Sequence, residues 1–297
     1  MEGPRLRPGV PVLERPDGAL QVGWRRPVLF HDVSRADRAL LGRLSGAGGA
    51  ANDADHRIVE RLRTAGLLAR DEVPPLPRVR VHHTGTLGVA IAASAARLGM
   101  TVGFAGDTTP MPDGTTRSWW ALRALRAAHA PARVLPAEGP CDVDVLVAVG
   151  CAPPHAAVLM ARDQRHLIVT TDEHGIEVSH VVIPGTTACG TCLALAAVPD
   201  DPALPWLAAQ LATTAPSAPG RSVITAAALA AHACLHGAGA PQEPKDESDD
   251  QPHHGWRISH AGAVTILAAS PHPDCRCGAA GEPGDALAAR RARFHSR

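Results

Sequence analysis

The chain has 297 residues and no net formal charge, because 29 lysine and arginine residues balance 29 aspartate and glutamate residues. This balance gives no electrostatic reason to expect a nucleic-acid partner or an anionic membrane surface. No apolar run reaches the length of about 18–20 residues that spans a membrane, and the first residues lack the apolar core of a secretory signal. Together with seven cysteines that do not suggest a disulfide scaffold, these features predict a cytoplasmic protein with one large domain or two smaller ones.

Residues 1–74 are predicted to form a small separate domain. Three short apolar runs separated by turn signals predict a small antiparallel sheet over residues 10–14, 19–23 and 28–33. Two helical patterns follow, one capped by Ser34 and ended by Gly46, and one from about Asp55 to Ala65. This order is typical of a winged helix, a fold that usually binds DNA. The last helix, however, carries as many acidic as basic residues in its neighbourhood, so a DNA site is not supported, and a purely structural appendage remains the alternative.

Residues 71–77 contain three prolines in four positions and are predicted to be a linker, which places the second domain at 75–297. Past it, strands and helices alternate, as in a parallel α/β sheet. The predicted strands cover 78–82, 101–105, 143–149, 166–170 and 176–183, followed by helices and a hairpin of 256–260 and 264–268. The segment 237–254 is rich in proline, glycine and acidic residues and is predicted to be a disordered loop.

The first strand of this domain leads into a partial dinucleotide-binding motif. Gly85 and Gly88 match two glycines of the G-x-G-x-x-G pattern, and Asp107 follows the next strand, where an acidic residue contacts ribose hydroxyls. His83 replaces the first glycine, and its side chain would crowd a bound phosphate.

Two cysteine pairs predict a structural metal site. Cys189 and Cys192 form a Cys-x-x-Cys motif, while Cys275 and Cys277 form a Cys-x-Cys motif. Four thiolates from two tight turns suit tetrahedral zinc, with every position filled by protein, so this zinc would hold structure and perform no chemistry. A redox Cys-x-x-Cys and unrelated buried cysteines are the alternatives. The other three cysteines are interpreted as small buried residues, although Cys151 lies at the mouth of the nucleotide-type crevice and could be reactive.

Taken together, these motifs resemble the ThiF/ubiquitin-activating-enzyme superfamily. The turn 184–192, the segment 201–205 and the motif 272–278 resemble more narrowly the actinobacterial ThiF-like partner proteins of azoline-forming, YcaO-type peptide cyclodehydratases. Residues 1–74 are similar to the winged-helix peptide-recognition element of such proteins. The resemblance implies a homodimer that binds the leader of a ribosomal precursor peptide and presents it to the cyclodehydratase, which forms thiazolines or oxazolines.

Adenylating members of this superfamily use ATP and Mg²⁺, and the chain departs from them at three positions. His83 replaces a glycine of the phosphate loop, Gly150 stands where the family's metal-binding aspartate is expected, and the only lysine, Lys245, lies in the acidic loop. Arg117, Arg123 and Arg126 could substitute only in part, since arginine does not replace a flexible lysine point charge. We therefore expect a scaffold that does not use ATP, with Gly85, Gly88 and Asp107 as remnants of a cofactor site.

As a scaffold, the first domain would add the leader peptide as a strand beside residues 28–33, with the last helix as the second wall. The candidate contact residues are Leu29, Phe30, His31, Ile58, Arg61 and Leu62. About half of these should be core residues, because alternate strand positions face inward. Two other functions stay open: an adenylyltransferase acting on a peptide or carrier C-terminus, and an NAD-dependent oxidoreductase with structural zinc, for which His83 and His155 are the only nearby proton-transfer groups.

Overall fold

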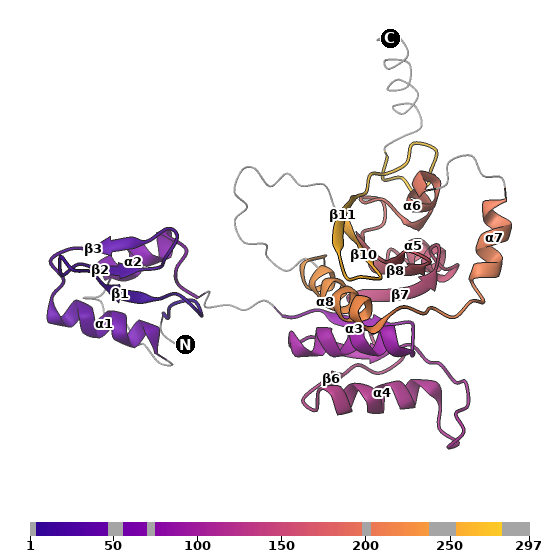
Figure 1. Cartoon of the computed structure of the whole chain (residues 1–297), viewed down its shortest axis with the longest axis horizontal. Helices are drawn as coiled ribbons and strands as arrows, with labels where there is room; N and C mark the ends of the chain where they lie inside the picture. Colours follow the sequence, from indigo (N-terminus) through magenta and orange to yellow (C-terminus); the bar gives the residue numbers. More distant parts are fainter. Residues whose placement is uncertain (1–3, 47–55, 70–74, 198–202, 238–253, 281–297) are drawn as a thin grey trace, which may run out of the picture. The chain divides into compact units, whose positions relative to one another are not determined.

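A computed structural model describes residues 4–46, 56–69, 75–197, 203–237 and 254–280 (Figure 1). The chain divides into two compact units, Met1–Pro74 and Pro75–Arg297. No helix in the described part of the chain is both long enough and apolar enough to cross a membrane. Most of the loop expected at 237–254, namely 238–253, lies outside the described residues, as does Lys245.

The first unit is a three-stranded antiparallel sheet with two helices. The strands follow the order β1-β2-β3. The elements of this unit are β1 (Val12–Glu14), β2 (Leu20–Val22), β3 (Val28–Phe30), α1 (Arg35–Ser45) and α2 (His56–Thr64). Gly18 turns the first hairpin with φ of +81°, a value that suits glycine. Ser34 and Asp37 form a reciprocal capping box that fixes where α1 begins.

This unit has a hydrophobic core of its own. The apolar faces of both helices and residues from β2 and β3 supply it, and its fully buried members include Leu40, Leu41, Leu44 and Leu62. Each of these leucines is at most 1% exposed. Because it has a hydrophobic core of its own, we expect the first unit to fold independently.

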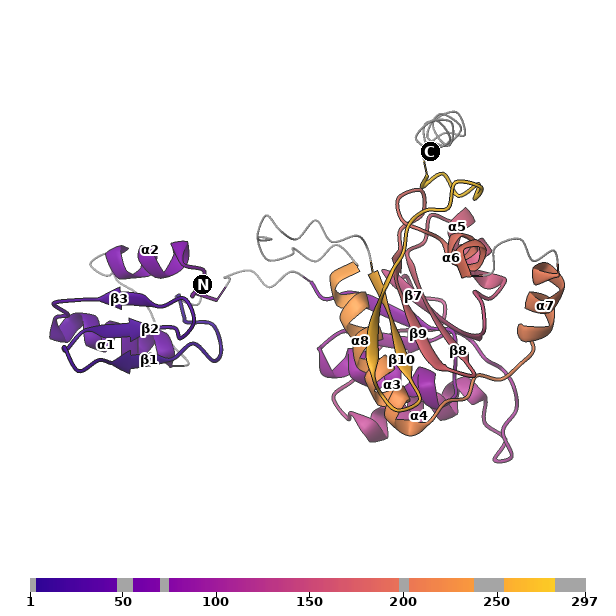
Figure 2. The same ribbon diagram turned by 45° about the horizontal axis from the view of Figure 1, so that its top comes forward.

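The second unit is an α/β layer structure built on one eight-stranded sheet (Figure 2). Its strands are β4 (Arg78–Val81), β5 (Thr101–Phe104), β6 (Arg133–Val134), β7 (Val143–Val149), β8 (His166–Asp172), β9 (Gly175–Val182), β10 (His254–Ser259) and β11 (Val264–Ala268). Its helices are α3 (Thr86–Arg97), α4 (Arg117–Ala128), α5 (His155–Ala161), α6 (Gly190–Ala197), α7 (Leu204–Leu211) and α8 (Gly220–Gly237).

The strands follow the order β11-β10-β9-β8-β7-β4-β5-β6. Strands β4 to β8 are mutually parallel where they pair, whereas β9, β10 and β11 add as an antiparallel extension. Helices α3, α4 and α8 pack on one face of the sheet, and α5 and α6 pack on the other. The mainly parallel α/β class predicted from the sequence is thus confirmed, while the two-residue strand β6 was not predicted.

Candidate functional site

A cavity of the described second unit opens at the carboxyl ends of its parallel strands. Its volume is about 640 Å³, and its walls come from the ends of β4 and β5, the first turns of α3 and α4, and the segment 215–220 before α8. This edge of a parallel sheet is where doubly wound folds bind their ligands. The predicted residues Gly85 and Asp107 line the cavity, together with His83, Arg117 and Trp120.

His83 occupies the amino-terminal end of α3. Its Nδ1 accepts a hydrogen bond from the backbone N–H of Gly88 at 3.3 Å, so the ring acts as a cap for a helix whose N-cap residue, Gly85, has no side chain. Burial lowers the pKa of His83, and the positive charge of Arg117 lowers it further, against a smaller opposing effect of Asp107. The imidazole is therefore neutral, as an acceptor at Nδ1 must be. A phosphate bound at this helix would need the same amide.

Gly85 and Gly88 are both required by the position of His83. A Cβ atom on Gly88 would lie 2.0 Å from the carbonyl oxygen of His83, and one on Gly85 would lie 2.7 Å from Cε1 of its ring. The first contact is with backbone and cannot be relieved by a side-chain rotation. The imidazole thus accounts for the glycine at position 85, whereas the backbone carbonyl of residue 83 accounts for the glycine at position 88.

Asp107 is held by its own neighbours. Thr84 donates its hydroxyl to Oδ2 at 2.8 Å, and the backbone N–H of Thr109 donates to Oδ1 at 3.0 Å. Burial alone would raise the pKa of Asp107, but these bonds and the charge of Arg117 outweigh it and bring the pKa below its usual value. The carboxylate is ionised at neutral pH and faces the cavity as a hydrogen-bond acceptor.

The cavity carries little positive charge for a triphosphate. Of its described lining residues, Arg117 is the one permanent cation. The end of β7 offers no carboxylate for a metal, because Gly150 stands there with φ of +69°. A Cβ atom at Gly150 would meet Cδ1 of Leu211 at 2.7 Å, so α7 packs where an acidic side chain would begin.

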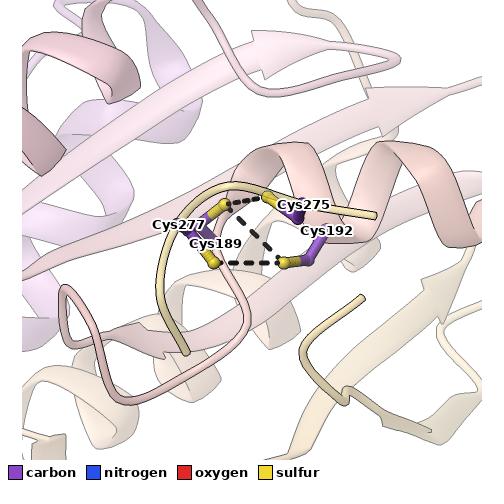
Figure 3. A group of neighbouring side chains, drawn as sticks. All are labelled: Cys189, Cys192, Cys275 and Cys277. Carbon is purple, nitrogen blue, oxygen red and sulfur yellow. Dashed lines mark hydrogen bonds between the residues drawn. The ribbon is translucent and has the colours of Figure 1, made fainter. Parts of the chain in front are cut away.

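The four cysteines predicted to bind metal come together in one cluster (Figure 3). The Sγ atoms of Cys189 and Cys192 are 3.8 Å apart, those of Cys189 and Cys275 are 3.6 Å apart, and those of Cys192 and Cys277 are 3.5 Å apart. Tetrahedral zinc with Zn–S bonds of about 2.3 Å places its sulfurs about 3.8 Å apart. A disulfide would bring two sulfurs to about 2.05 Å, and all four thiols are free.

The surrounding structure holds the first cysteine pair firmly. His180 on β9 hydrogen-bonds through Nε2 to the carbonyl oxygen of Ala188 at 2.8 Å, and Thr187 accepts the backbone N–H of Ile183 at 2.8 Å. Cys189 and Cys192 belong to the apolar core between the sheet and α5, against which Cys275 and Cys277 pack. The cluster could hold one metal ion, and its four-sulfur donor set suits zinc.

A second concave surface lies in the first unit, between β3 and α2. This groove has a volume of about 650 Å³ and is lined by Pro27, Val28, Leu29, His31, Glu60, Arg61, Thr64 and Ala65. Of the predicted contact residues, Leu29, His31 and Arg61 line it. Phe30, Ile58 and Leu62 are at most 3% exposed and belong to the core of the unit, so they offer nothing to a ligand in the groove. Glu60 and Thr64 were not singled out from the sequence, since a polar helix surface gives no signal of its own.

The second unit also contains a buried polar network that sequence analysis did not identify. Asp144 is 2% exposed on β7 and accepts a hydrogen bond from Nε2 of His82 at 2.6 Å and from the thiol of Cys141 at 3.1 Å. Burial, with the negative charge of Asp144, raises the pKa of Cys141 to about 12, so this thiol is not a nucleophile at neutral pH. Partners 62 positions apart cannot be paired by reading a single strand.

No protein-family model matches the chain, and neither does any curated protein sequence. Solved structures do share its fold. MccB of E. coli is 12% identical, with a TM-score of 0.55 over 93% of this chain and 96% of MccB. The microcin C7 biosynthetic enzyme MccB in complex with N-formylated MccA gives 12% identity and a TM-score of 0.57 over 93% and 99% of the two chains. A heterocyclase in complex with substrate and cofactor is 14% identical, with a TM-score of 0.61 over 94% of this chain and 40% of the heterocyclase.

These likenesses extend over nearly the whole chain and therefore include both of its units. At this level of identity they define a shared fold, and the MccB structures match from end to end. The chain spans less than half the length of the heterocyclase.

Proposed function

We propose that the protein is a non-catalytic scaffold of ribosomal-peptide biosynthesis. Its first unit, interpreted as a winged-helix recognition domain, binds the leader of a precursor peptide in the groove between β3 and α2. Its second unit, a ThiF-like domain held by a zinc clip, docks a separate ATP-dependent, YcaO-type cyclodehydratase and forms a homodimer. The cyclodehydratase then converts residues of the core peptide to thiazolines or oxazolines.

The observation that carries this proposal is the His83 cap on α3. A triphosphate would have to displace a half-buried imidazole from the Gly88 amide before it could use the helix end. It would then meet a single described cation, Arg117, and no carboxylate at Gly150 to hold Mg²⁺. We expect each of these features to lower the affinity for ATP. His83 and Arg117 line the cavity itself, and Gly150 follows the neighbouring strand β7.

The fold likenesses support a role on peptides. The similar structures include an MccB bound to N-formylated MccA and a heterocyclase bound to substrate and cofactor. The chain spans 40% of the heterocyclase, and the proposal assigns the ATP-dependent step to a separate protein.

An ATP-dependent adenylyltransferase that activates a peptide or carrier C-terminus is the second candidate. It is favoured by the end-to-end match to MccB, structures of which contain ATP, and by an ionised Asp107 in the position of a ribose contact. This function requires His83 to leave the helix end when nucleotide binds.

Calorimetric titration of the zinc-replete full chain separates the two candidates. We expect no heat from Mg²⁺ and ATP up to millimolar concentration, and saturable heat from a leader peptide encoded beside this protein. Micromolar ATP binding that Asp107→Asn weakens, while Asp163→Asn outside the cavity does not, would overturn the scaffold proposal. Failure of every such leader to bind would also overturn it.

A further inference from the structure

The strand β3 forms an open edge of the sheet in the first unit. In the order β1-β2-β3 it pairs with β2 alone among the described residues of this unit, in the register Leu20 with Phe30 and Val22 with Val28. In an antiparallel ladder, consecutive residues point their backbone groups to opposite sides. An open edge of this kind is what an extended peptide joins when it adds a strand.

Arg61 already occupies this edge. From α2, which lies beside β3 (Figure 2), its guanidinium donates a hydrogen bond to the carbonyl oxygen of Leu29 at 3.0 Å and lies 4.7 Å from the ring centroid of Phe30. The bond indicates that Leu29 presents its backbone toward α2 and away from β2. A peptide that paired with Leu29 would compete with Arg61 for this oxygen.

The charges around the groove favour an acidic occupant. The carboxylate of Glu60, the one described acidic group of the lining, is ion-paired with Arg63. Arg61 lines the groove, and the exposed residue Arg25 lies two positions before Pro27, which also lines it. An incoming carboxylate could pair with the guanidinium of Arg61, whereas a peptide without an acidic residue would compete for the Leu29 carbonyl and offer Arg61 no charged partner.

We propose that Arg61 is a latch on β3 that opens for an extended peptide with an aspartate or glutamate beside Leu29. The peptide carboxylate takes over the guanidinium, in the two-pronged geometry that arginine forms with carboxylates, and the freed carbonyl of Leu29 accepts a backbone N–H of the peptide. The groove thus selects an acidic segment. The inference rests on the proposed leader-binding role of this groove and adds the chemistry of the residue that it selects.

The test uses a displayed library of random peptides, selected on the zinc-replete full chain. Wild-type protein should enrich peptides with an acidic residue at one fixed position. Arg61→Gln should lose that preference, whereas Arg35→Gln, which removes an exposed charge from α1 of the same unit, should keep it. For one enriched peptide, changing its glutamate to glutamine should weaken binding to wild type about tenfold or more, and to Arg61→Gln by less than about twofold.

Two failures can be told apart by Leu29→Pro, which removes an N–H from an edge where proline is tolerated. If no peptide is enriched, or if enriched peptides bind Leu29→Pro as well as wild type, the groove is not a peptide site and the proposed function itself fails. If binding depends on Leu29 but Arg61→Gln enriches the same acidic position, the groove is a peptide site and the latch is wrong. Circular dichroism of each variant verifies that the unit remains folded.

Discussion

At the residue scale, the imidazole of His83 makes both a hydrogen bond and a close packing contact. It caps α3 through the amide of Gly88, and its Cε1 atom leaves no room for a side chain at Gly85. At Gly88 the backbone carbonyl of the same residue takes that room. Sequence analysis predicted that His83 would crowd a bound phosphate, because a bulky residue replaces a glycine in a known pattern, but it did not predict the contact with Gly85. It did not predict the hydrogen bond, because which acceptor a helix end uses depends on the rotamer of the ring.

Burial of His83 makes stability depend on pH. In the folded chain the pKa of His83 lies below its usual value, about 6.5, so the unfolded chain binds more protons in this range. Stability is present above about pH 6.5 and falls as the pH drops below it. We expect His83→Gln, which keeps an acceptor but does not titrate, to lose less unfolding free energy than wild type between about pH 8 and pH 5.5. Urea unfolding at both values measures this, and equal losses in the two proteins would contradict it.

Gly88 should tolerate no side chain. Gly88→Ala places a Cβ atom 2.0 Å from the His83 carbonyl oxygen, and we expect a loss of more than about 2 kcal/mol of unfolding free energy, since backbone must move. Gly106→Ala is the matched control, because nothing lies within 4 Å of its added Cβ atom. Its effect should stay within about 0.5 kcal/mol. A mild effect of Gly88→Ala in urea unfolding would show that His83 is not fixed in this position.

At the scale of elements, the cysteine cluster connects the start of α6 to the segment after β11, which are far apart in the sequence. Two short motifs with turn residues were enough to predict that the four cysteines lie together, because cysteine pairs with this spacing occur in few other kinds of site. The groove on the first unit was harder to define. The alternation of side chains along β3 correctly predicted that about half of the candidate contact residues belong to the core. Only the structure shows which ones.

Loss of one ligand should release the metal. We expect about one zinc per chain in wild type, and a substoichiometric content in Cys275→Ser, measured by inductively coupled plasma mass spectrometry. Cys151→Ser, a half-buried cysteine outside the cluster, should keep its metal. Cys275→Ser should also melt several degrees lower, since about 1 kcal/mol shifts Tm by roughly 2–4 °C in a unit of this size. Unchanged metal content in Cys275→Ser would exclude a four-cysteine site.

At the scale of the whole molecule, the chain consists of two units with separate hydrophobic cores. The alternation of strands and helices from residue 78 onward made the second fold class predictable, since an apolar strand such as β7 buried on both faces is typical of parallel sheets. The pairing of Asp144 with His82 and the two-residue strand β6 were not predictable. Both depend on contacts between segments rather than on any local pattern.

The two units should unfold separately. Chelation of the metal with a strong chelator should lower the Tm of one calorimetric transition, that of the second unit, and leave the other unchanged. An isolated fragment of residues 1–74 should reproduce the unaffected transition. A single transition that shifts as a whole with chelator would show that the units are thermodynamically coupled.

The hydrogen bond between His83 and the start of α3 also affects which substitutions this chain can accept during evolution. Under the scaffold proposal, His83→Gly would leave a helix amide without its cap while Gly150 still lacked a carboxylate, so this step alone would cost stability without restoring a reaction. An acidic residue at position 150 would in turn need Leu211 to move. Each first step taken alone would therefore lower stability without a gain in activity. Under the scaffold proposal, nucleotide binding could therefore return only through coordinated changes at His83, Gly150 and Leu211.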